Sequence, residues 1–153
     1  MTVSVRSATP ADADRIADWQ VQMARETEDR ALDRERVGRG VARCLADPIK
    51  GRYLVAELDG EPVGSLLLTT EWSDWRDGWF WWIQSVFLAP AARGHGVYKA
   101  MQAKVVADAQ ADPDVRGVRL YVEEENAHAR RVYAALGFEN TSYRLYEIDF
   151  DAT

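Results

Sequence analysis

The sequence has little cysteine and little histidine. Cys44 is the one cysteine among 153 residues, so the chain cannot form an internal disulfide. The two histidines, His95 and His128, are scattered relative to it, and this set does not make a metal site. The sequence contains no apolar run of about 18 residues and no signal-peptide core. We therefore expect a cytoplasmic protein that has no resident metal and no membrane partner.

Positive charge is also scarce. Lysine and arginine number 19 against 25 aspartates and glutamates, which gives a formal net charge of −6 at pH 7. A protein that binds nucleic acid without sequence preference needs a basic face, so that class is disfavoured and a cationic small molecule is the favoured partner. With 47% hydrophobic residues, the length suits one globular domain over residues 1–153.

Local patterns predict an alternating order of strands and helices. Thr9-Pro10-Ala11-Asp12 predicts the start of a first helix that ends within residues 25–30, because a hydroxyl, a proline and an acid suit successive positions there. Two Asp-Gly pairs, at 59–60 and 77–78, predict hairpin turns. Strands are predicted at residues 3–6, 53–58, 63–70, 79–88, 118–122 and 142–150, and further helices at 33–47, 96–109 and 127–136. A helix joins the fourth and fifth strands, so these two should be parallel within a mixed α/β sheet.

A glycine-rich loop links the strand at 79–88 to the next helix. It reads Arg93-Gly94-His95-Gly96-Val97-Tyr98-Lys99. Glycine has no Cβ, so backbone N–H groups can close on a phosphate, and the positive end of the helix dipole adds to the attraction. The loop therefore predicts an anion site that suits a pyrophosphate, although two glycines between a strand and a helix also serve as a tight turn.

Two nucleotide-binding motifs fit this loop poorly. A Walker-type loop needs Lys followed by Ser or Thr after the second glycine, and Val97-Tyr98 supplies neither. A dinucleotide motif needs a third glycine at position 99, which is Lys99. It also needs an acid about 20 residues further on, and Glu123 lies too far along the chain. Both interpretations are therefore weakened.

The loop, Pro90, the strand at 118–122 and the segment 126–138 together resemble the GCN5-related N-acetyltransferase (GNAT) superfamily. The resemblance covers nearly the whole chain and departs from the phosphate-binding motif at Tyr98, where a small residue is usual. It implies a mixed, mostly antiparallel sheet with a central parallel strand pair and helices on both faces. It also implies acetyl-CoA as co-substrate, held by Val86, Phe87, Leu88, Arg93, Gly94, His95, Gly96, Val97, Tyr98, Lys99, Asn126 and Tyr133.

The resemblance implies transfer of acetyl to a primary amine, of a small molecule in our interpretation, by direct attack on the thioester. Tyr133 lies two helical turns after Asn126 and would protonate the departing thiolate, a task that suits its ordinary pKa of about 10. A backbone N–H at 86, 87 or 88 would stabilise the carbonyl oxygen as it becomes negative.

The sequence does not identify a single general base. Many relatives carry a carboxylate at a position that here is Gln84 or Ser85. We favour Glu71 as the base, because partial burial beside Trp72 would raise its pKa. The alternatives are Glu26, Glu28, Glu123 or a relay of water molecules.

Residues of the helical hairpin and the tryptophan-rich strands are candidates for binding the amine. These are Glu26, Glu28, Gln84 and Trp82. The tryptophans equally suit hairpin packing or a dimer surface, and an exposed last strand is compatible with a homodimer. Two other functions stay open: a non-catalytic sensor that binds acyl-CoA, and an enzyme that acetylates proteins.

Overall fold

The structure is a computed structural model that describes residues 1–151. The chain divides into two compact units, residues 1–121 and the residues from 122 onward, and each is described by itself. Among the described residues, no helix combines the length and the apolar character needed to cross a membrane. A single domain over residues 1–153 stays a prediction.

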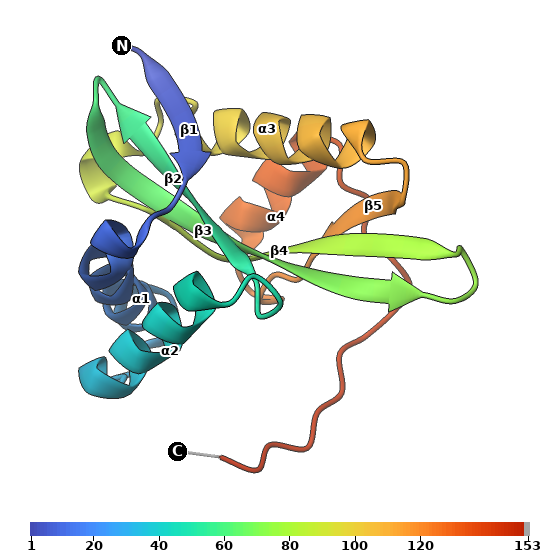
Figure 1. Cartoon of the computed structure of the whole chain (residues 1–153), viewed down its shortest axis with the longest axis horizontal. Helices are drawn as coiled ribbons and strands as arrows, with labels where there is room; N and C mark the ends of the chain where they lie inside the picture. Colours follow the sequence, from blue (N-terminus) through green and yellow to red (C-terminus); the bar gives the residue numbers. More distant parts are fainter. Residues whose placement is uncertain (152–153) are drawn as a thin grey trace. The chain divides into compact units, whose positions relative to one another are not determined.

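The first unit contains a five-stranded sheet in the order of the sequence (Figure 1). Neighbouring strands are antiparallel except for the last pair, which is parallel as predicted. Both Asp-Gly turns form, with Asp59 and Asp77 in the left-handed region at φ 51° and 50°. The strands are β1 (Val3–Ser7), β2 (Arg52–Leu58), β3 (Glu61–Ser73), β4 (Gly78–Leu88) and β5 (Val115–Leu120).

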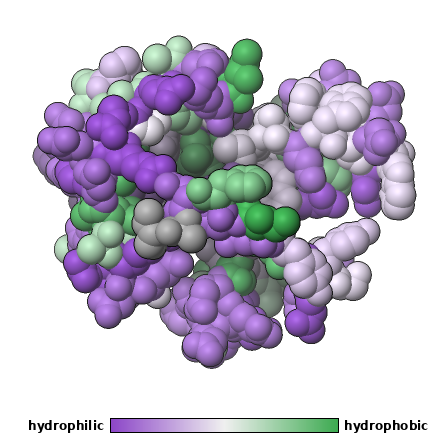
Figure 2. Space-filling view, turned by 90° about the horizontal axis from the view of Figure 1, so that it is seen from below, coloured by the Kyte–Doolittle hydropathy of each residue, from purple (hydrophilic) through white to green (hydrophobic). Residues whose placement is uncertain are grey.

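Helices cover both faces of this sheet, so the predicted fold class is confirmed (Figure 1). On one face lie α1 (Ala13–Glu28) and α2 (Arg34–Ala46), and on the other lies α3 (Val97–Ala111). The core under the first pair consists of Ile16, Ala17, Val41, Cys44, Tyr53 and Val55. From below, most of the molecule's face is hydrophilic, with hydrophobic residues in small separate areas (Figure 2). This is the pattern of amphipathic helices whose apolar stripes are buried.

The second unit contains one helix, α4 (Ala127–Ala135), within the range predicted for it. The Asn126 side chain accepts a hydrogen bond from the N–H of Ala129 at 3.1 Å and so caps the helix. Gly137 follows the helix at φ 100°, a conformation that suits glycine.

The strand predicted at 142–150 is wrong. Residues 143–149 have no regular secondary structure, and alternate apolar side chains such as Tyr146 and Ile148 are exposed. Alternation of apolar and polar residues indicates which side of a strand would be buried. A strand also needs hydrogen bonds from a neighbouring strand, and the alternation does not show whether such a neighbour exists. The parallel pair β4–β5 consequently lies at one end of the described sheet and not at its centre.

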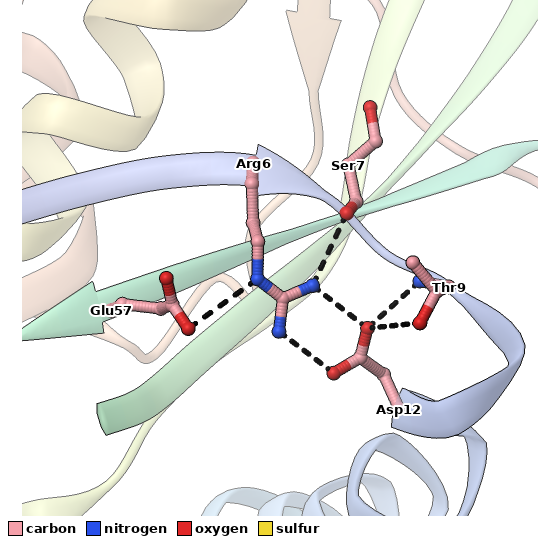
Figure 3. Close-up of polar contacts among 5 residues, drawn as sticks. All are labelled: Arg6, Ser7, Thr9, Asp12 and Glu57. Atoms are coloured by element: carbon pink, nitrogen blue, oxygen red, sulfur yellow. Dashed lines mark hydrogen bonds and ion pairs between the residues drawn. The ribbon is translucent and has the colours of Figure 1, made fainter. Parts of the chain in front are cut away.

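A buried carboxylate anchors β1 to the start of α1 (Figure 3). Asp12 is 7% exposed, and both of its oxygens accept hydrogen bonds from the Arg6 guanidinium at 2.9 Å. The N–H of Thr9 donates to the same carboxylate at 2.8 Å, and Glu57 on β2 pairs with Arg6 at 3.4 Å. The Arg6 hydrogen bonds, followed by those from Thr9, lower the pKa of Asp12 from 3.8 to about 2.

We predict that Asp12→Asn lowers the free energy of unfolding at pH 7 by about 2 kcal/mol, the cost that corresponds to this pKa difference. Because the folded-state pKa is depressed, the ionised carboxylate stabilises the fold fully above about pH 4, and this stabilisation is lost as the pH falls toward 2. Urea unfolding curves at pH 7 and pH 3 measure the difference. Asp74→Asn is the control, because Asp74 is exposed. An equal loss of unfolding free energy in Asp12→Asn and Asp74→Asn would contradict the stabilising role assigned to the Asp12 carboxylate.

Candidate active site

The centre of the candidate site is an irregularity in β4. Gln84 lies opposite Leu67 and Phe87 lies opposite Ser65, so three steps along β4 match two steps along β3. Ser85 takes up the extra residue in the left-handed region, at φ 52°. This is a β-bulge, a feature that bends a strand and changes which face its later side chains occupy.

The bulge puts two side chains of opposite phase on one face. In a regular strand, residues 84 and 87 would point to opposite faces. Here the Gln84 amide donates to Thr69 Oγ1 at 2.5 Å, while the Phe87 ring lies 5.8 Å from Trp19 of α1. Leu67, which lies opposite Gln84, packs against the core under α1 and α2, so both side chains face the side of the sheet that α1 covers.

Beyond the bulge, one edge of β4 has no strand partner within residues 1–121. β5 pairs with β4 only as far as Ile83 opposite Leu120, while β4 continues to Leu88. The predicted donors at positions 86, 87 and 88 all lie in this part of the strand. An unpaired strand edge offers N–H and C=O groups to an extended ligand.

The glycine loop follows this edge and leads directly into α3. Gly94 and Gly96 have φ values of 82° and 72°, and a Cβ at either position would meet no atom within 4 Å. α3 begins at Val97, whose side chain is 1% exposed, so the loop is fixed where the helix starts. The first N–H groups of a helix have no partner inside the helix. The loop therefore has the space and the donors that a pyrophosphate needs.

The remaining loop side chains differ in exposure. His95 and Lys99 are exposed, whereas Tyr98 is half-buried and its hydroxyl is buried. The Tyr98 ring therefore does not stand free above the loop.

Arg93 ties the loop to α1. Its Nη2 pairs with Glu26 Oε2 at 2.7 Å, and its Nε donates to the carbonyl oxygen of Leu88 at 3.1 Å. The hydrogen bond from Arg93 lowers the pKa of Glu26, so this carboxylate is ionised at neutral pH. The structure thus joins a predicted acceptor residue to a predicted cofactor residue. Glu28, also predicted for the acceptor, is the exposed last residue of α1.

Glu71, the predicted base, lies on β3 and is hydrogen-bonded to side chains of β4 and β5. Arg119 Nη1 donates to Glu71 Oε1 at 2.8 Å, and Trp82 Nε1 donates to the same oxygen at 3.1 Å. The Trp82 ring lies 6.0 Å from that of Tyr121. Sequence reasoning missed Arg119 and Tyr121. The predicted parallel pairing of the two strands was a partial signal, since alternate residues of adjacent strands share a face, but it did not give the register that pairs Arg119 with Trp82.

The predicted acid, Tyr133, belongs to the second unit. It lies on α4, and its ring packs edge to face on Phe138, with centroids 5.9 Å apart. Burial raises the pKa of Tyr133 above its usual value of 10.0, so the phenol stays protonated at neutral pH. Asn126 caps the same helix seven residues earlier.

Comparisons with known proteins agree with this fold. A family model described as the acetyltransferase (GNAT) family matches residues 13–138. An uncharacterized N-acetyltransferase of Archaeoglobus fulgidus is 30% identical over 134 residues, which are 87% of this chain and 90% of that protein. A possible acetyltransferase from Clostridium difficile 630 has a crystal structure 34% identical in sequence, with a TM-score of 0.91, covering 99% of this chain and 100% of that one.

A more distant structure contains the cofactor that the sequence suggested. This is a predicted acetyltransferase from Clostridium acetobutylicum, solved with acetyl-CoA. It matches with a TM-score of 0.77 at 17% identity and covers 96% of each chain. At that identity the likeness concerns the fold alone.

We predict that Ser85→Val lowers the free energy of unfolding by about 1–2 kcal/mol, because a β-branched residue is strained in the left-handed region. Ser85→Gly should leave stability unchanged or raise it slightly, since glycine adopts this conformation without a Cβ clash. Chemical unfolding of both variants, with Ser4→Val on the exposed face of β1 as control, measures the effect. A Ser85→Val variant as stable as Ser4→Val would contradict the assigned strain.

Proposed function

This chain belongs to the GNAT acetyltransferase family and is an N-acetyltransferase, and from that premise we propose that it transfers acetyl from acetyl-CoA to a primary amine of a small molecule, by direct attack of the amine on the thioester. The observation that carries the proposal is the continuity of the free edge of β4 with the glycine loop. One end of this path can pair with an extended amide-containing chain, and the other end can bind a pyrophosphate.

Main-chain atoms do most of the cofactor binding in this proposal. Acetyl-CoA supplies the activated acetyl group when it is bound. The N–H groups of residues 86–88 provide a donor for the acyl oxygen, whose negative charge increases during the reaction. The loop from Arg93 to Lys99 and the first turn of α3 hold the phosphates, while the Arg93 side chain is occupied by Glu26 and keeps the loop against α1. Asn126 is proposed to contact the pantetheine arm.

Tyr133 is the proposed general acid. A phenol with a raised pKa holds its proton across the neutral range and can donate it to a thiolate as that group departs. The Tyr98 ring sits at the position where the family has a small residue, and its buried hydroxyl favours a ring that packs inward and leaves the loop amides accessible.

Glu71 is our candidate for the group that accepts the proton from the amine, through water. Glu71 lies opposite Phe80 in the strand register, and Val86 is six residues further along β4, roughly 20 Å at about 3.3 Å per residue. Direct transfer over that distance is excluded for a glutamate side chain. A relay of waters with no dedicated base is the alternative.

The small-molecule acceptor is favoured over a protein because the Trp82 and Tyr121 rings line the acceptor side, and the lone cysteine favours the cytoplasm. A homodimer stays a proposal. The competing function, a non-catalytic acyl-CoA sensor, is favoured by one observation: position 84 is a glutamine, and its amide is bonded to Thr69.

We predict that Tyr133→Phe lowers kcat by about 10²- to 10³-fold while leaving the KM for acetyl-CoA little changed, because only proton donation is lost. In the wild type, kcat should stay level to above pH 10, since burial raises the pKa of the acid and activity is lost only as it deprotonates. Thiol release across a panel of primary amines measures both. Tyr146→Phe, at an exposed tyrosine, is the control.

A contrary result would favour the sensor. That result is saturable binding of CoA, measured by calorimetry, with no turnover of any amine and no difference between wild type and Tyr133→Phe.

We predict that Gly96→Ala weakens CoA binding at least tenfold, because a Cβ at this left-handed position strains the turn that aims the loop amides at the phosphates. Gly60→Ala is a matched control, since Gly60 also has a positive φ (84°) and open space beside it. Both variants should lose about 1 kcal/mol of stability. Calorimetric titration with CoA distinguishes the loss of binding from the loss of stability. Equal affinities of the two variants for CoA would contradict the proposal that the glycine loop binds the phosphates.

A further inference from the structure

A group of charged and aromatic side chains lies on one face of β3, β4 and β5, at the part of these strands that α1 and α2 do not cover. Register and alternation put side chains from three strands there: Thr69 and Glu71 of β3, Phe80, Trp82 and Gln84 of β4, and Arg119 of β5. Tyr121, which directly follows β5, joins them through its ring contact with Trp82. Hydrogen bonds and ring contacts connect them, as described above. We name this set the acceptor platform.

Arg119 is held in a fixed orientation on the platform. Its guanidinium carbon lies 3.6 Å from the centroid of the Phe80 ring, a stacked arrangement that fixes the plane of the cation. Gly117 makes room for that ring, because a Cβ there would lie 2.7 Å from a Phe80 carbon. Stacking leaves the N–H donors in the plane of the guanidinium, where a carboxylate binds through two parallel hydrogen bonds.

Glu71 and Arg119 form an ion pair that a ligand can enter. The Glu71 and Arg119 side chains are 47% and 30% exposed, so both charges are reachable. Trp82 and Arg119 both donate to Oε1 of Glu71, and no described residue donates to Oε2. Exposed ion pairs contribute little to stability, so exchanging part of this contact for a ligand costs the fold little.

The neutrality of the pair selects the charge of its ligand. A purely cationic end group would take Glu71 from Arg119 and leave a guanidinium without its counter-ion. A purely anionic end group would do the reverse to Glu71. A group that carries both an ammonium and a carboxylate satisfies Arg119 and Glu71 together, because each charge meets its opposite.

The platform lies at a distance from the site of acetyl transfer. Arg119 is opposite Trp82, and Val86 is four residues further along β4, on the order of 13 Å. Between them the Gln84–Thr69 hydrogen bond and the Trp82 ring line the same face. A methylene chain along Trp82 would join a head group on the platform to an amine near the bulge.

We propose that the acceptor platform binds the zwitterionic head of an amino acid whose chain ends in the reacting primary amine. This inference rests on the proposed acetyl transfer and adds the class of acceptor. Arg119 binds the α-carboxylate, Glu71 binds the α-ammonium, and the Trp82 and Tyr121 rings line the methylene chain. With Glu71 held by the head group, the proton of the reacting amine leaves through the relay of waters named above as the alternative to a dedicated base. The expected acceptor is thus a diamino acid, and not a simple diamine.

Three probes of matched chain test the proposal. L-Lysine carries both head charges, cadaverine is the same chain without the carboxylate, and 6-aminohexanoate is the same chain without the α-ammonium. The wild type should use lysine with a kcat/KM at least about tenfold above that for either analogue, since a site built for two charges rejects a ligand that lacks one.

Two variants should each lose one part of that selectivity. Arg119→Gln should bring the lysine-to-cadaverine ratio to within about twofold, and Glu71→Gln should do the same for the lysine-to-6-aminohexanoate ratio. Arg76→Gln is the matched control, because the Arg76 guanidinium also lies over the Phe80 ring, at 5.1 Å, without pairing with Glu71. It should keep both ratios.

Calorimetric binding of the same probes to the CoA-loaded protein separates this inference from the proposed function. Lysine binding that is lost in Arg119→Gln supports the platform even if no amine is acetylated, in which case the proposed function alone fails. Turnover of cadaverine equal to or above that of lysine overturns the platform and leaves the acetyltransferase standing. Absence of lysine binding together with turnover of other amines overturns it as well.

Discussion

The phase of β4 is the constraint on which the rest of the site depends. A single extra residue, accommodated by Ser85 in the left-handed region, lets Gln84 and Phe87 share a face although they are three positions apart in the sequence. Phe87 then packs beside Trp19 of α1, while Gln84 bonds to Thr69 on the same face as Trp82. One backbone irregularity therefore decides both how β4 joins the core and what its exposed face offers.

Charged contacts then hold the helices to this strand framework. Asp12 and Arg6 lock the beginning of α1 to β1, and Glu26 and Arg93 connect its last turn to the glycine loop. The two pairs differ in environment. In the first pair the Asp12 carboxylate is buried and well supplied with donors, so it contributes to stability, whereas both side chains of the second pair are substantially exposed and contribute mainly to the position of the loop.

The sequence predicted what local chemistry dictates. The Asp-Gly turns, the helical turn that begins at Pro10 just before α1, and the parallel β4–β5 pair were predicted from short sequence patterns, and all are confirmed. The bulge was not predicted, because Ser85 has no residue-type signature for a positive φ. The Glu71–Arg119 pair joins residues 48 apart, and the partner of a charge depends on strand register. The failed strand at 142–150 has the same origin, since a ladder needs a neighbour that alternation does not identify.

The groups proposed to carry out acetyl transfer and those proposed to select the acceptor lie in different parts of this molecule. The groups proposed to meet the thioester and the phosphates are largely main-chain amides between residues 86 and 99, whereas the acceptor platform consists of side chains drawn from three strands. Amides survive almost any substitution that preserves the bulge and the two loop glycines. Side chains such as Trp82 and Arg119 can change without disturbing them. A fold arranged in this way can exchange one acceptor for another by point substitution while its acyl-donor machinery stays intact.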